Sequence, residues 1–151
     1  MAAVEHKWQP LAQGRLKCNI DTAFSEQFRR TCIGLFLWND FGTFVLAKML
    51  QFDSIYPVEV GESLGLFHAL EWINDMQFDN IDFVLDFKTT TDAFNTHRID
   101  ISELGSIIDA CWNLFATSFT ISRVEFSRRQ ANVAAHALAR EATSITSPVI
   151  Y

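Results

Sequence analysis

The chain has 151 residues and a mass of 17.2 kDa, and 49% of its residues are hydrophobic. This composition argues against a disordered chain and predicts one domain with a full core. The net charge of -6 and the pI near 5.1 argue against a protein that binds nucleic acid mainly through a basic surface. A nucleic-acid enzyme with a metal site is still compatible with this charge, because metal-binding carboxylates are themselves acidic.

The three cysteines, Cys18, Cys32 and Cys111, match no zinc-binding spacing. They predict buried, reduced thiols in an intracellular protein. The sequence has no charged-then-apolar leader and no apolar run that would cross a bilayer. We therefore expect an unsecreted protein of the nucleus or cytoplasm that makes no membrane contact. We also expect a monomeric domain, with a larger parent protein as the alternative.

The first half of the chain predicts three strands. Residues 1–14 show no period and form a lead-in segment. Residues 15–23 alternate apolar and polar side chains, which indicates a strand with one apolar face. The apolar segment 31–38 and the segment 43–50 flank the turn formers at 39–42, so we expect a hairpin and, with the first strand, an antiparallel meander.

The period then changes to that of a helix. Residues 58–76 carry apolar side chains at steps of three and four, with Pro57 directly before them. Gly61 and Gly65 lie on one side of this helix, where they would allow a close approach to the sheet. The remaining pattern predicts a strand at 80–86, helices at 89–95 and 101–117, a strand at 119–126, an Ala-rich helix at 131–142 and a tail at 144–151.

Three acidic residues stand out by their positions. Asp21 lies in a mostly apolar strand, Glu62 lies one turn into a helix, and Asp86 ends an apolar strand. Buried carboxylates are costly unless they are paired, hydrogen-bonded or bound to metal. Each acid also has an ordinary explanation: Asp86 as a helix cap, Glu62 as a partner of the helix dipole, and Asp21 as the end of its strand.

A set of carboxylates is also what a hard divalent cation requires. Mg2+ prefers oxygen ligands and keeps several waters, so a few carboxylates suffice to hold it. Two such ions that share a carboxylate can act on both the attacking and the leaving oxygen of a phosphodiester. If the three acids meet in space, they therefore predict a magnesium site.

Four segments, in this order, resemble the motifs of the ribonuclease H-like family. They are NIDTAF at 19–24, GESLGLFHAL at 61–70, VLDFKTTTDAF at 84–94 and RRQANVAAHALAR at 128–140. The nearest likeness is to the plant branch that resembles the ribonuclease H domain of non-LTR retrotransposon reverse transcriptases. The segment 8–19 is similar to that branch too, so the resemblance covers essentially the whole chain.

The resemblance implies an α/β fold: a mixed five-stranded sheet, with three antiparallel and two parallel strands, flanked by helices over residues 15–143. It implies metal-dependent hydrolysis of the RNA strand of RNA/DNA hybrids, with Mg2+ or alternatively Mn2+ as cofactor. Asp21, Glu62 and Asp86 match the family's metal ligands and catalytic acids. Near the last strand–helix junction, the residues expected to contact nucleic acid are Arg128, Arg129 and Asn132, and Arg123 is a further candidate for phosphate contact. A solvated surface is the alternative for the three arginines.

The sequence departs from the family pattern at three positions. His136 stands where the family usually has Asp, and we assign it as a fourth catalytic residue or, equally, as the structural partner of a neighbour. Thr22 replaces the Gly that is common after the first Asp, and Phe87 replaces a small Ser after the third. The ring of Phe87 would either pack in the core or narrow the site of the hybrid.

These departures leave two alternatives to the nuclease. The first is a catalytically weakened nucleic-acid-binding or scaffold domain derived from a retroelement. The second is a protein-interaction module that uses exposed aromatic residues, namely Trp38, Phe41, Phe44 and Trp112.

Overall fold

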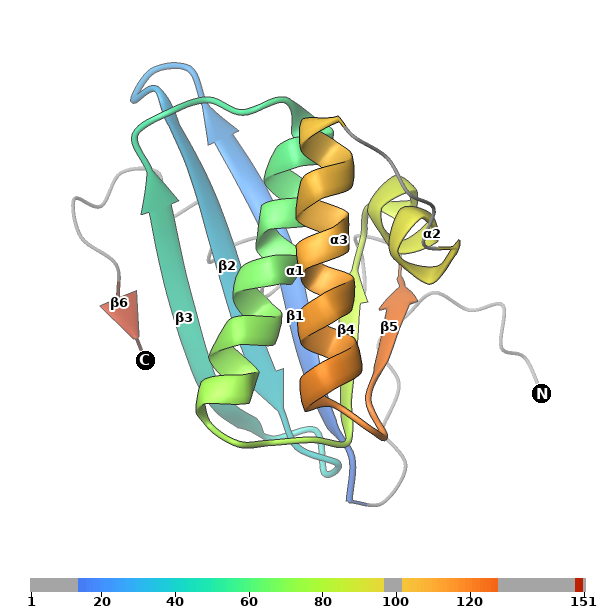
Figure 1. Ribbon diagram of the computed structural model, residues 1–151. Helices are drawn as coiled ribbons and strands as arrows, with labels where there is room; N and C mark the ends of the chain where they lie inside the picture. The colour runs from blue at the N-terminus through green and yellow to red at the C-terminus, as the bar shows by residue number, and fades with distance from the viewer. Residues whose placement is uncertain (1–13, 97–101, 128–148, 151) are drawn as a thin grey trace.

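A computed structural model describes residues 14–96, 102–127 and 149–150. Its centre is one mixed sheet with the strand order β5-β4-β1-β2-β3-β6. Helices α1 and α3 run side by side across one face of this sheet, and the short α2 lies beyond its β4–β5 side (Figure 1). The elements are β1 (Leu16–Ser25), β2 (Arg30–Trp38), β3 (Phe44–Phe52), α1 (Val58–Asp75), β4 (Ile81–Leu85), α2 (Lys88–Thr96), α3 (Glu103–Ser118), β5 (Arg123–Phe126) and β6 (Val149–Ile150).

Strands β1, β2 and β3 form the predicted antiparallel meander. The β2–β3 hairpin closes on the side chain of Asn39, whose Oδ1 accepts hydrogen bonds from the backbone N–H groups of Phe41 and Thr43. Gly42 supplies a positive φ of 75° in the same turn, a conformation that glycine adopts without strain. The turn formers at 39–42 therefore act as the sequence indicated.

Strands β4 and β5 add the two predicted parallel strands, β4 beside β1 and β5 beside β4. The mixed sheet of three antiparallel and two parallel strands is confirmed. A sixth, two-residue strand, β6, pairs with β3 at the other edge through Lys48 and Met49. No pattern in the sequence predicted this strand, because two residues are too few to carry a period.

The central strand β1 differs from its prediction in one respect. The alternation of residues 15–23 predicts one apolar face and one polar face, and Cys18 and Ile20 do lie fully buried in the core under α1. The polar set is buried as well, with Lys17, Asn19 and Asp21 at 7%, 2% and 0% exposure. Strand β1 lies between β4 and β2, so side chains of both neighbouring strands flank this polar set on its face of the sheet.

An ion-paired cluster joins the three parallel strands at the start of β1. The carboxylate of Asp82 on β4 accepts hydrogen bonds from Nε of Arg15 and from Nε of Arg123 on β5, each at 3.1 Å. Burial lowers the pKa of the neighbouring Lys17, although Glu125 and Asp82 oppose this shift. Burial, followed by repulsion from Asp82, raises the pKa of Glu125. The cluster fixes β1, β4 and β5 in register at the end opposite to Asp21.

Two element boundaries differ from the prediction for identifiable reasons. Helix α3 begins at Glu103 because Ser102 caps it, its hydroxyl accepting a hydrogen bond from Gly105 N–H at 3.1 Å. Strand β5 begins at Arg123 rather than at Phe119. Phe119 instead ends α3 and turns its buried ring onto Phe83 at 5.5 Å between centroids.

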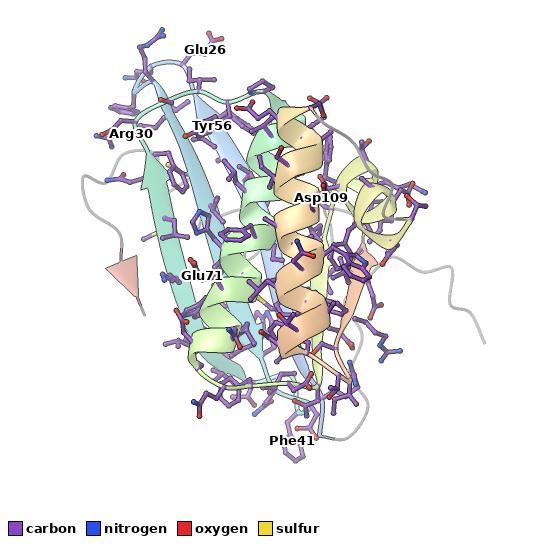
Figure 2. All side chains as sticks on the ribbon, viewed as in Figure 1. Glu26, Arg30, Phe41, Tyr56, Glu71 and Asp109 are labelled. Carbon is purple, nitrogen blue, oxygen red and sulfur yellow. The ribbon has the colours of Figure 1, made fainter. Side chains whose placement is uncertain are left out.

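The exposed aromatic residues lie on more than one element. Phe41 is 85% exposed at the tip of the β2–β3 turn and points away from the sheet (Figure 2). Phe44 packs against Trp38 at 6.3 Å between centroids, and Trp38 is half-buried rather than exposed as expected. Trp112 lies on α3. Among the described residues, no helix combines the length and hydropathy of a membrane span. The helix expected at 131–142 lies outside the described residues.

Candidate metal centre

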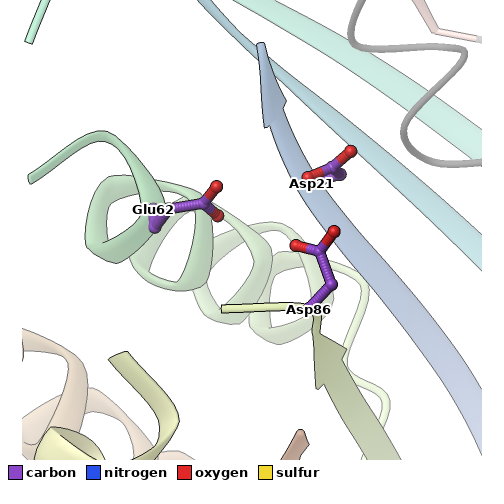
Figure 3. A group of neighbouring side chains, drawn as sticks. All are labelled: Asp21, Glu62 and Asp86. Atoms are coloured by element: carbon purple, nitrogen blue, oxygen red, sulfur yellow. The ribbon is translucent and has the colours of Figure 1, made fainter. Parts of the chain in front are cut away.

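Three carboxylates from three separate elements meet where β4 ends beside the middle of β1. Asp21 lies on β1, Glu62 on the first turns of α1, and Asp86 directly after β4 (Figure 3). One oxygen of each carboxylate lies within 4.8 Å of the corresponding oxygens of the other two. Asp21 is 0% exposed, Glu62 is 5% exposed and Asp86 is half-buried.

Parallel pairing of β1 and β4 brings the two aspartates together. Ile20 lies opposite Leu85 in the register of this pair. Asp21 and Asp86 are each the next residue along the chain, so both stand at the same level of neighbouring strands. Parallel strands lie close together, less than 5 Å apart. The convergence of the two aspartates therefore follows from strand register.

Helix α1 brings the third carboxylate because it approaches β1 closely. A Cβ added at Gly65 would lie 3.1 Å from Cγ2 of the buried Ile20, and one added at Gly61 would lie 2.7 Å from the ring of Phe24. The predicted role of both glycines in close packing is confirmed by this geometry. Glu62, between them in sequence, is thus held close to Asp21 and Thr22 of β1.

Two threonines fix the start of α1 in this position. The hydroxyl of Thr31 donates a hydrogen bond to Ser54 O at 2.8 Å and accepts one from Tyr56 N–H at 3.1 Å, which holds the loop leading into the helix. The hydroxyl of Thr22 donates to Oε2 of Glu62 at 3.1 Å. The sequence indicated Thr22 only as a departure from the family pattern. No local pattern indicated this contact, because Glu62 lies 40 positions further along the chain.

The donor set suits a hard divalent cation. Three carboxylates supply oxygen ligands, which Mg2+ and Mn2+ prefer, and their spacing leaves room for shared coordination. Like charges at this distance repel one another, and a cation between them offsets that repulsion. Softer ligands are not at hand among the described cysteines, which are buried and whose thiols have raised pKa values, about 11 for Cys32 and about 12 for Cys111, because of burial.

The remaining predicted site residues cannot be placed beside the three acids. His136, Arg128, Arg129 and Asn132 lie outside the described residues. His68, the only histidine among the described residues, packs against Phe52 and Phe67 at ring distances of 5.4 and 5.5 Å. Burial lowers its pKa, although Glu71 opposes this shift. His68 is thus a packed residue of α1.

Solved structures share this fold at low sequence identity. The ribonuclease H1 of Halobacterium salinarum aligns with a TM-score of 0.74 at 23% identity, over 85% of this chain and 97% of that one. The N-terminal ribonuclease H domain of rv2228c from Mycobacterium tuberculosis gives 0.72 at 16%, over 85% and 93%. LC11-RNase H1, solved in complex with an RNA/DNA hybrid, gives 0.73 at 12%, over 84% and 95%. The protein therefore has a ribonuclease H-like fold.

The sequence itself places the chain in a family. The model of the reverse transcriptase-like family matches residues 19–142, a range that includes Asp21, Glu62 and Asp86. The chain belongs to this reverse transcriptase-like family. No curated protein matches it.

Proposed function

We propose that this protein is a metal-dependent endonuclease that hydrolyses the RNA strand of RNA/DNA hybrids. The observation that carries the proposal is the convergence of Asp21, Glu62 and Asp86 within 4.8 Å, from three elements far apart in the sequence. The family and the fold support it, and LC11-RNase H1, which has this fold, was solved with such a hybrid. We also propose that the domain derives from a retroelement and belongs to the plant branch of the family. The assignment to the plant branch is supported by the motif resemblance alone.

In this proposal the three carboxylates hold Mg2+, or alternatively Mn2+. Bound divalent ions would supply activation of the attacking water and stabilisation of the leaving 3'-oxygen. The chain's own part is positional: Asp21 and Asp86 are fixed by the register of β1 and β4, and Glu62 by the packing of α1. A preorganised site of this kind loses little free energy to rearrangement during the reaction.

The proposal also retains the expected contacts with the substrate. Arg128, Arg129 and Asn132 would contact the nucleic acid, and His136 would assist catalysis. These roles rest on the motif at 128–140. An intracellular location, in the nucleus or cytoplasm, is likewise proposed and is supported by the three free, buried cysteines.

Cleavage of a labelled hybrid tests the proposal. We expect the purified protein to cut the RNA strand with Mg2+, and Asp21→Asn or Asp86→Asn to slow cutting by about a thousandfold or more, since a lost metal ligand costs several kcal/mol of transition-state stabilisation. The matched control is Asp75→Asn, which removes the same charge at the exposed, far end of α1. It should cut at the wild-type rate.

The weakened binding domain is the second candidate, and one observation favours it. The half-buried Phe87 lies directly after Asp86, where a bulky ring can obstruct a hybrid. This alternative predicts a shift of labelled hybrid in a gel at low salt, with the RNA left intact in Mg2+ and in Mn2+. A folded protein that binds the hybrid without cutting it would overturn the nuclease and leave the binding domain.

A further inference from the structure

The contact between Thr22 and Glu62 assigns a role to a residue outside the carboxylate set. We propose that Thr22 is the positioning residue of the metal centre, and that its hydroxyl sets the affinity for Mg2+ by fixing the carboxylate of Glu62. The proposal rests on the proposed function, because it requires the three carboxylates to bind metal.

The hydroxyl of Thr22 lies within the contact between β1 and α1. It donates to Oε2 of Glu62 at 3.1 Å, and the carbonyl oxygen of Gly61 lies at the limit of hydrogen bonding, 3.5 Å away. A hydroxyl has one proton, so the shorter and charge-assisted bond to the carboxylate takes it. Thr22 and Glu62 are 4% and 5% exposed, so water competes little for this bond.

Helix α1 leaves space for the hydroxyl of Thr22. At Gly65 an added Cβ would lie 3.4 Å from Oγ1 of Thr22 as well as 3.1 Å from Ile20, so the absence of a side chain there makes space for the threonine. Thr22 also follows Asp21 directly on β1. One short segment therefore carries one metal ligand and the group that orients a second.

Orientation matters most for the glutamate. Glu62 reaches the site through a longer side chain than either aspartate, so it loses more rotamer freedom when it binds metal. A hydrogen bond that fixes the carboxylate beforehand removes part of this cost, and partners of this kind typically change metal affinity by about 10–100-fold. Thr22 is one such partner, so we expect the lower end of that range.

The test compares two substitutions of Thr22 in the full chain. Thr22→Val keeps the branched shape and removes the hydroxyl, whereas Thr22→Ser keeps the hydroxyl and removes the methyl group. Mg2+ alone is titrated into each protein in a calorimeter, and thermal unfolding in EDTA confirms that each is folded. We expect Thr22→Val to weaken Mg2+ binding about tenfold and Thr22→Ser to bind as the wild type does.

A second pair of variants asks whether the hydroxyl acts through Glu62. In a Glu62→Gln background, Thr22→Val should weaken Mg2+ binding no further, because the charged acceptor is already lost. An equal loss in both backgrounds would overturn the proposal, as would a loss in Thr22→Ser with none in Thr22→Val. Wild-type protein that binds no Mg2+ would remove this role together with the proposed function. The remaining outcome is a wild-type protein that binds Mg2+, a Thr22→Val variant that binds it more weakly, and no cleavage of the hybrid. That outcome would support the positioning role of Thr22 and overturn only the proposed nuclease activity.

Discussion

At the scale of the single residue, Gly65 decides how near α1 comes to β1. Its missing side chain leaves space for both Ile20 and the hydroxyl of Thr22. Glycine within a helix costs about 1 kcal/mol relative to alanine, so the position trades helix stability for close packing. The geometry of the carboxylate set depends on that trade, because Glu62 lies one turn before Gly65 on the same helix.

We predict that Gly65→Ala lowers the free energy of unfolding by about 1 kcal/mol. The methyl group would lie 3.1 Å from Cγ2 of the fully buried Ile20, and overpacking in a core costs about 1–3 kcal/mol against a propensity gain of about 1 kcal/mol. Urea unfolding measures the change. Ser106→Ala, on an exposed position of α3, is the control for propensity and should not destabilise the protein. Stabilisation by Gly65→Ala would contradict the close packing.

At the scale of the element, Asp79 explains where β5 begins. Its carboxylate accepts hydrogen bonds from the backbone N–H of Thr120 at 2.9 Å and from the hydroxyls of Thr120 and Ser122 at 2.7 and 2.6 Å. The residues that follow α3, 120–122, therefore bond to the side chain of Asp79 instead of pairing as part of a strand. Burial opposes ionisation here, but these hydrogen bonds, with one from Asn80 N–H, bring the pKa of Asp79 well below its ordinary value.

We therefore predict that Asp79→Asn lowers the free energy of unfolding at pH 7 by about 1–3 kcal/mol, since hydrogen bonds to a charged group are lost. A carboxyl group with a lowered pKa stabilises the fold fully above its unfolded pKa, near 3.8, and loses this effect as the pH falls through the folded value. The difference between wild type and variant should therefore shrink below about pH 4. Urea unfolding at pH 7 and pH 3 measures it, with Asp75→Asn as the control. An equal difference at both pH values would count against a charge effect.

The helices and strands also show which features of the fold a local sequence pattern can predict. Strands β2 and β3 and helix α1 could be predicted from periodicity and from the turn formers between them, because these signals are local. The start of β5 could not, since Phe119 and Ile121 continue an alternating pattern, while the carboxylate of Asp79, some 40 residues earlier, accepts hydrogen bonds from the backbone N–H groups of Thr120 and Ile121. The burial of Lys17 and Asn19 was equally hidden, because it depends on the strands beside β1.

At the scale of the whole molecule, the site is a product of topology. The pattern of single acids among apolar residues identified Asp21, Glu62 and Asp86 as candidates. It could not show that they meet, because their distances depend on the register of β1 with β4 and on the approach of α1. The bond from Thr22 to Glu62 was hidden for the same reason. It joins residues 40 positions apart, across the contact between helix and sheet.

A crystal structure of the protein soaked with Mn2+, with the ion located from its anomalous signal, tests whether the three carboxylates bind metal. We expect a peak bound by the carboxylates of Asp21, Glu62 and Asp86, and the loss of this peak in Asp21→Asn. A saturating soak that leaves no metal at these three side chains, or that shows them turned away from one another, would overturn the metal centre.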